Sequence, residues 1–217
     1  MLPQLTDFFA LLEINLVICA LCLHFLSWRK RINGDVTTWA KWGTVVVFAV
    51  LWCPLGTANL PIVAYVRGVS SDLSITLVVL SCIVLLRRMF GFCIVDNRDL
   101  KALLVALAIA ALFLYPLALG WGDWDPYRLG WGEPGMWLVL LMVSLVYWVK
   151  GLRLLPLLVG LALLGWSAGV MESTNLWDYL IDPWLAIFAI FYSVFSAAKN
   201  LPGRFQPVPR GVDTTVN

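Results

Sequence analysis

Apolar and polar positions divide the chain into long hydrophobic stretches separated by short polar connections. The predominantly apolar stretches are residues 8–27, 43–62, 72–90, 102–120, 135–149, 154–171 and 183–198. A helix needs about 20 mostly apolar residues to cross a bilayer core about 30 Å thick, and most of these stretches approach that length. Backbone polar groups find no water inside lipid, so each stretch is expected to be helical. The pattern predicts an all-α, polytopic membrane bundle of about seven transmembrane helices.

The composition agrees with lipid as the solvent for most of the chain. Of the 217 residues, 61% are hydrophobic and 13% are charged. An average soluble domain has about 45–50% apolar and about 25% charged residues. The net charge of +2 supplies no basic field, so nucleic acid is not expected as a partner.

The basic residues predict an orientation. All of the 15 lysines and arginines except Arg67 and Arg128 lie in alternate connections or in the C-terminal stretch. Because cytoplasmic loops carry an excess of lysine and arginine, we expect the N-terminus outside and the C-terminus in the cytoplasm. A multi-pass protein of the plasma membrane or the bacterial inner membrane is therefore predicted. Residues 1–199 are expected to form one bundle, and the polar residues 200–217 a disordered cytoplasmic tail.

Ionisable residues inside a bilayer are costly and need an explanation. Glu13, Arg67, Asp72 and Glu172 all fall in the predicted outer third of the membrane. They fit either a polar vestibule or interfacial residues joined in an arginine–carboxylate clasp. The vestibule hypothesis expects Glu13, Arg67 and Asp72 to point into one cavity with Asn59, and Glu172 completes the candidate ligand-binding set.

Asn59 lies in an irregular part of the second apolar stretch. Pro54, Gly56 and Pro61 surround it, and proline removes a helical hydrogen bond. The pattern predicts a kinked or a broken helix. Broken helices expose backbone groups that transporters use to hold ligands, although neighbouring helices also satisfy such groups.

The connection between the fourth and fifth stretches is rich in tryptophan, glycine and acidic residues. Its candidate contact residues are Trp121, Trp124, Tyr127, Arg128 and Trp131. They are typical of an aromatic belt at the headgroup level. The alternative is a surface for a sugar, a lipid headgroup or a partner membrane protein.

The sequence predicts no cofactor, no metal site and no disulfide framework. His24 is the only histidine, and four of the five cysteines lie inside apolar stretches. Cys19 and Cys22 form a CxxC pair on one helical face, but cysteine in an apolar helix usually behaves as a small hydrophobe.

Three functional hypotheses follow from these features. The first is transport, or an accessory role in transport, for a small solute or lipid headgroup in a tryptophan-rich protein of the cell envelope. The second is a structural or assembly subunit of a larger membrane complex. The third, an enzyme acting on an outer-leaflet substrate through carboxylates such as Asp72 and Glu172, is the least favoured because no catalytic histidine is available. No catalytic residue is assigned.

Overall fold

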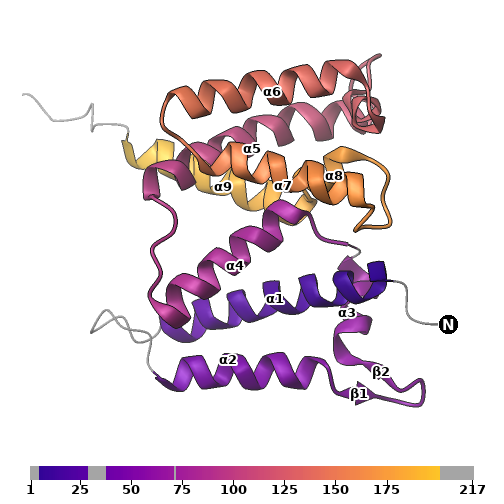
Figure 1. Cartoon of the computed structure of the whole chain (residues 1–217), viewed down its shortest axis with the longest axis vertical. Helices are drawn as coiled ribbons and strands as arrows, with labels where there is room; N and C mark the ends of the chain where they lie inside the picture. Colours follow the sequence, from indigo (N-terminus) through magenta and orange to yellow (C-terminus); the bar gives the residue numbers. More distant parts are fainter. Residues whose placement is uncertain (1–4, 29–37, 71, 201–217) are drawn as a thin grey trace, which may run out of the picture.

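The computed structural model describes residues 5–28, 38–70 and 72–200, and the fold is almost entirely helical (Figure 1). The first part comprises α1 (Leu5–Trp28), α2 (Thr38–Leu51), α3 (Ile62–Ser70) and α4 (Ile75–Phe90). The second comprises α5 (Asn97–Ala118), the 3-10 helix η1 (Pro126–Trp131), α6 (Pro134–Val149), α7 (Leu154–Ala168), α8 (Leu176–Leu180) and α9 (Pro183–Asn200). The prediction of an all-α fold is confirmed.

The helices form two halves that meet along α4. In the first half α1 contacts α2, α3 and α4, and in the second α5 packs on α9 while α7 packs on α6 and α8. The halves join where α4 contacts α7 and α8. In Figure 1 α1 and α2 lie at the bottom, α5, α6, α7 and α9 at the top, and α4 crosses between them. A recess between two such halves is a natural position for a site.

Each of the seven predicted apolar stretches contains one of the longer helices, but their lengths differ. Thr6–Ser27 and Asn97–Ala118 are long and apolar enough to cross a membrane. The other apolar helices are shorter: Thr38–Leu51, Pro134–Val149, Leu154–Ala168 and Pro183–Lys199. The tail predicted at residues 200–217 lies outside the described residues except for Asn200, which ends α9.

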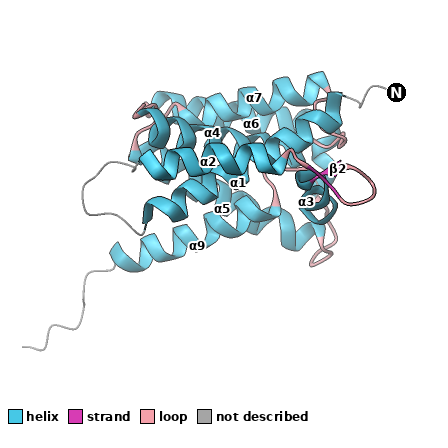
Figure 2. Cartoon of the chain, turned by 90° about the horizontal axis from the view of Figure 1, so that it is seen from below, coloured by secondary structure: helices cyan, strands magenta, loops and turns pink. Residues whose placement is uncertain are grey.

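The second stretch is broken. Helix α2 ends at Leu51, and the chain then forms an antiparallel hairpin of β1 (Pro54–Leu55) and β2 (Leu60–Pro61) before α3 begins. Pro54 pairs with Pro61, and neither can donate the backbone hydrogen bond that would continue a helix. Asn59 takes a left-handed conformation with φ 54°, which asparagine tolerates in turns. The prediction of a kinked or broken helix in residues 43–62 is confirmed, and the helix is broken rather than kinked. Figure 2 shows the hairpin and α3 at the same end of the bundle as the N-terminus.

Two helices begin at side-chain caps that also tie the halves together. The Ser74 hydroxyl accepts a hydrogen bond from the Leu77 N–H at the start of α4. Asp182 accepts one from the Leu185 N–H at the start of α9, where Pro183 occupies the first helical position. The other Asp182 oxygen accepts from both the hydroxyl and the N–H of Ser74, at 2.6 and 3.1 Å. This buried link fixes the start of α9 against the start of α4.

Candidate ligand-binding cavity

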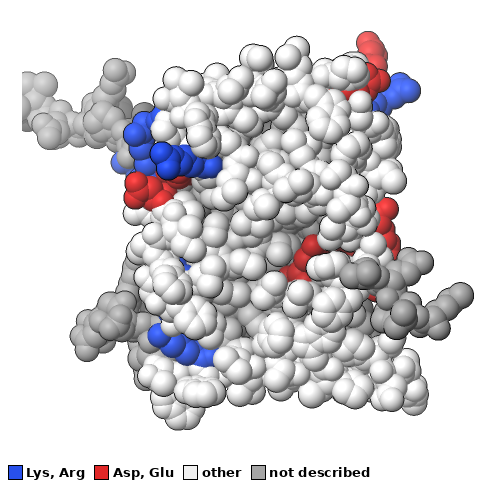
Figure 3. Space-filling view, viewed as in Figure 1, with Lys and Arg blue, Asp and Glu red and all other residues white. Residues whose placement is uncertain are grey.

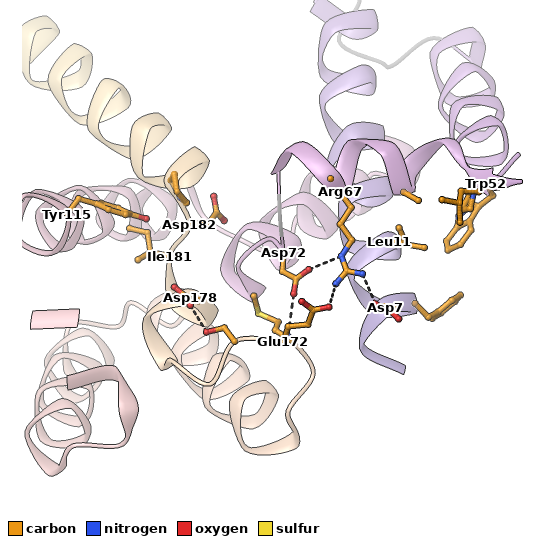
Figure 4. Close-up of a pocket in the computed structure, with 18 residues that line it drawn as sticks. Asp7, Leu11, Trp52, Arg67, Asp72, Tyr115, Glu172, Asp178, Ile181 and Asp182 are labelled. Carbon is orange, nitrogen blue, oxygen red and sulfur yellow. Dashed lines mark hydrogen bonds and ion pairs between the residues drawn. The ribbon is translucent and has the colours of Figure 1, made fainter. Parts of the chain in front are cut away.

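A cavity of about 1060 Å³ lies between the two halves, at the end where α1 begins. One wall comes from α1, the segment around the hairpin, and α3, and the other from the segment after α7 and the start of α9 (Figure 4). Its charged lining residues are Asp7, Arg67, Asp72, Glu172, Asp178 and Asp182. Five carboxylates face one guanidinium, a formal charge of −4 when all are ionised.

Arg67 is the centre of an ion-pair cluster made with Asp7, Asp72 and Glu172, called the Arg67 cluster below. Each guanidinium nitrogen contacts a different carboxylate: Nη1 lies 2.7 Å from Asp7 Oδ1, Nε lies 3.1 Å from Asp72 Oδ1, and Nη2 lies 2.7 Å from Glu172 Oε1. Figure 4 shows the three carboxylates arranged around the guanidinium. The fork geometry of arginine holds its orientation when several nitrogens are engaged.

Local structure brings these groups together. Arg67 lies in the last turn of α3, and Asp72, shortly before α4, accepts a hydrogen bond from Arg67 Nε. Asp7 lies in the first turn of α1, where the helix dipole favours a negative charge. The Glu172 N–H donates to Asp72 Oδ2 at 3.3 Å, so the segment after α7 is tied to this cluster through backbone as well as side chain.

The electrostatics of the cluster keep Arg67 charged. Burial by itself lowers the pKa of Arg67, but the hydrogen bond to Asp7 and the charges of Asp72 and Glu172 outweigh it and raise the pKa above its ordinary value. Asp72 and Glu172, the carboxylates of the enzymatic hypothesis, therefore both bind the same guanidinium.

The two remaining lining carboxylates have structural partners. Asp182 is occupied by Ser74 and by the start of α9. Asp178 Oδ2 accepts hydrogen bonds from the Tyr127 hydroxyl, at 2.8 Å, and from the Ser173 hydroxyl. Burial, the hydrogen bond to Asp178, and the charges of Asp178 and Asp125 raise the pKa of Tyr127. Tyr127 therefore stays a neutral donor to Asp178.

One side of the cavity is apolar and aromatic. The rings of Phe8 and Trp52 stack with centroids 5.6 Å apart, and Leu11 and Leu60 also line this wall. Figure 4 shows Trp52 and Leu11 on one side of Arg67, and Asp178, Asp182 and Tyr115 on the other. The cavity therefore combines a charged centre with a surface suited to apolar groups.

The structure brings together three of the five predicted site residues: Arg67, Asp72 and Glu172. Asn59 lies in the exposed turn of the hairpin formed by the pairing of Pro54 with Pro61, and it is not among the lining residues. Glu13 is 7% exposed and lies near enough to Asp72 and Arg67 to interact electrostatically, but it does not line the cavity. The expectation that Asn59 and Glu13 share one cavity with Arg67 and Asp72 is corrected accordingly.

Sequence reasoning did not include Asp7, Asp178 and Asp182 in the candidate site. All three lie on the predicted outer side, Asp7 and Asp182 directly before apolar stretches and Asp178 within a connection, which was the available signal. That signal places them at one end of the bundle but does not pair them with Arg67, from which Asp7 is 60 residues distant in the chain.

The aromatic connection has two roles in the structure. Trp121, Trp124 and Trp131 are exposed. Tyr127 instead turns inward to Asp178, and its backbone carbonyl accepts from Asn175 Nδ2 at 2.9 Å. Arg128, in η1, is exposed, and none of these five candidate residues lines the cavity.

The residues of the cavity are the guide to its chemistry. Comparisons with protein-family models, with curated proteins and with solved structures each found no match for this chain. Within the described ranges, no three histidine, cysteine, aspartate or glutamate side chains are grouped so that they could hold a metal ion. The arrangement offers charge, hydrogen-bond acceptors and an aromatic wall in a cavity large enough for a small organic molecule.

Proposed function

We propose that the chain is an integral, multi-pass membrane protein of the cell envelope, with its N-terminus outside and its C-terminus in the cytoplasm. The support is the apolar character of its surface. Large hydrophobic side chains are exposed along α2, α5, α6 and α9, among them Trp42, Leu112, Leu141 and Phe191. Contiguous exposed apolar surface on this scale is rare in soluble monomers but is required in lipid.

The distribution of charge supports the proposed orientation. Basic residues lie where α4 ends, α5 begins and α9 ends: Arg87, Arg88, Arg98, Lys101 and Lys199. The acidic cavity lies at the opposite end of the helices. Figure 3 shows most of the visible basic side chains at one end, with acidic ones beside them, and further acidic side chains in the recess between the halves near the other end. Lysine and arginine favour the cytoplasmic side, which supports an outer-leaflet position for the cavity.

Labelling of engineered cysteines tests this orientation. Val69, which is 88% exposed beside the cavity, and Thr38, at the opposite end of the bundle, are each replaced by cysteine after the exposed Cys53 and Cys93 are changed to serine. A membrane-impermeant maleimide added to intact cells is expected to label Val69→Cys only, and to label both variants after permeabilisation. Labelling of Thr38→Cys alone in intact cells would reverse the proposed orientation.

We further propose that the cavity binds a small solute or a lipid headgroup, and that the protein acts in its transport or as an accessory to a transporter. The observation that carries this proposal is the cavity itself, built by both halves around the Arg67 cluster. Transport sites commonly lie between two structural units of a bundle, where the units move relative to each other. Charged groups held within a membrane protein are costly unless they serve such a site or stabilise the fold.

A cavity-filling substitution tests the binding proposal. Gly68 lines the cavity, and a Cβ atom added there meets nothing within 4 Å, so Gly68→Trp is expected to fill space without breaking the fold. Gly135→Trp is the matched control, because Gly135 is equally open and lies outside the cavity. Native mass spectrometry of the protein from dodecyl maltoside is expected to detect a bound small molecule or lipid on the wild type and the control, but not on Gly68→Trp. Equal adducts on all three proteins, or none on any, would contradict the proposal.

A further inference from the structure

We propose that the ligand of the cavity is an organic cation: an ammonium group attached to an apolar or aromatic body. This inference rests on the proposed binding function and names the chemical class that the same cavity would select. The sources of such a group are a free amine or the amine-bearing headgroup of a lipid. The charge of the cavity lining, the solvent access to its carboxylates and its aromatic wall each support a cationic ligand over a neutral or anionic one.

The charge of the lining favours a cation. Five carboxylates surround one guanidinium, and the guanidinium is already bound by three of them. An anion would have to displace at least one carboxylate from Arg67 while approaching the others, and like charges in a partly desolvated site repel strongly. A cation instead meets the excess negative charge of the lining.

The exposed carboxylates leave acceptor oxygens accessible to an ammonium group. Arg67 contacts Oε1 of Glu172 and Oδ1 of Asp7, and not the second oxygen of either group. Their side chains are 65% and 41% exposed, so the cavity can be reached from solvent on this side. An ammonium with three donors can bind both carboxylates while Arg67 stays in place.

A buried carboxyl group lies beside the cluster and outside the cavity lining. Glu13 is more than nine-tenths buried, and its Oε2 atom has no hydrogen-bond partner among the described residues. The negative charge that a ligand meets is therefore that of the five lining carboxylates.

The aromatic wall provides a surface against which the apolar part of the ligand can pack. Asp7 and Phe8 are consecutive at the start of α1, so an acidic group and an aromatic ring face the cavity side by side. Phe8 stacks on Trp52, and tryptophan and phenylalanine faces attract cations and pack well against apolar groups. A volume of about 1060 Å³ far exceeds the space that a simple ammonium ion fills.

Three compounds of similar shape and different charge provide the test. Binding of 2-phenylethylamine, 2-phenylethanol and 3-phenylpropionate to the full-length protein in uncharged dodecyl maltoside is measured by quenching of tryptophan fluorescence. The amine is expected to bind about tenfold or more tightly than the other two, the difference that one charge-assisted contact provides. In a parallel arm, native mass spectrometry compares retention of phosphatidylethanolamine and phosphatidylglycerol with identical acyl chains. Preference for the free amine alone identifies a soluble source, and preference for phosphatidylethanolamine alone identifies a lipid source.

A matched pair of variants locates the effect in the cavity. Glu172→Gln is expected to weaken binding of the preferred amine about five- to tenfold, because it removes a charged acceptor. Glu133→Gln removes the same charge from an exposed position outside the cavity and is expected to leave the affinity unchanged. Tighter binding of 3-phenylpropionate or of phosphatidylglycerol, abolished by Gly68→Trp, would overturn the cationic class and leave the binding function standing. Failure of every compound and both lipids to bind would contradict the binding function and this inference together.

Discussion

Two polar clusters at the same end of the molecule are held together by different interactions. The loop cluster, comprising Tyr127, Gly130, Ser173, Asn175 and Asp178, joins η1 to α8. Its central residue, Asn175, bonds to backbone groups: Oδ1 accepts from the Trp177 N–H, and Nδ2 donates to the Tyr127 carbonyl. The Arg67 cluster is instead centred on ion pairs between side chains, and both clusters contribute to the cavity lining.

The loop cluster fixes the path of the backbone, whereas the Arg67 cluster supplies charge to the cavity. Asn175 is 1% exposed and its bonds fix the path of two backbone segments, which gives the loop cluster little freedom. Glu172 and Asp7 are exposed and reach Arg67 through flexible side chains, whose ion pairs in contact with solvent contribute little to stability. We therefore expect substitutions in the loop cluster to reduce stability, and substitutions in the Arg67 cluster to change binding more than folding.

Gly130→Ala is expected to give the largest loss of stability, about 4 kcal/mol. An added Cβ would lie 1.8 Å from Asn175 Oδ1, so Asn175 would have to move and lose both its cap and its bond to Tyr127. Gly135→Ala, at an open position, is the control. Unfolding in mixed detergent micelles measures both. Equal stability of the two variants would show that the loop cluster is not rigid.

Asp182→Ala is expected to cost about 3 kcal/mol. The change removes the cap of α9 and leaves the buried hydroxyl and N–H of Ser74 without their acceptor. Asp123→Ala removes an exposed carboxylate at the same end of the molecule and serves as the comparison in the same unfolding assay. A loss below about 1 kcal/mol, the value of an ordinary hydrogen bond, would show that the link between α4 and α9 is not needed.

Arg67→Ala is expected to cost about 1–2 kcal/mol, less than either change above. It leaves Asp72 largely buried beside the other carboxylates without a cation. Arg67→Lys keeps the charge but not the three-way fork, and should recover about half of the loss. Glu172→Gln should cost about 0.5 kcal/mol or less, because that carboxylate is exposed. If Arg67→Ala proved as costly as Gly130→Ala, the contrast between the two clusters would fail.

Tyr127→Phe is expected to cost about 1 kcal/mol at pH 8, less than Gly130→Ala or Asp182→Ala, from the lost hydrogen bond to Asp178. The effect should depend on pH. Because the folded pKa of Tyr127 is raised, its stabilisation is complete below the unfolded value of about 10 and is lost as pH rises through the higher folded value. The stability difference between wild type and variant should therefore narrow above about pH 10. A constant difference from pH 8 to pH 11 would contradict the pKa shift.

The sequence predicts the helices better than their contacts. Apolar stretches locate the helices, and the pair Asp182–Pro183 has the pattern of a helix start. The two prolines at 54 and 61 predict a disturbance, but the hairpin depends on their pairing across the turn. Asn59 lies in that turn and outside the cavity lining.

The candidate site shows why long-range contacts are harder to predict. Arg67 and Asp72 are five residues apart, so their contact is local in the sequence. Glu172 lies 105 residues from Arg67, and their contact depends on how α4 packs against α7 and α8. Hydrophobic periodicity predicts which residues form helices, whereas the rotation and height of each helix follow from side-chain packing across the bundle.

Glu172 lines the cavity and also links the two halves through its ion pair with Arg67. Ligand binding and the relative position of the halves are therefore coupled. An ammonium that binds Glu172 and Asp7 while Arg67 keeps both ion pairs would add a further link between the halves near the cavity opening, and the buried bonds between Ser74 and Asp182 would be unchanged. By thermodynamic reciprocity, a change that separates the halves at the opening must also weaken ligand binding.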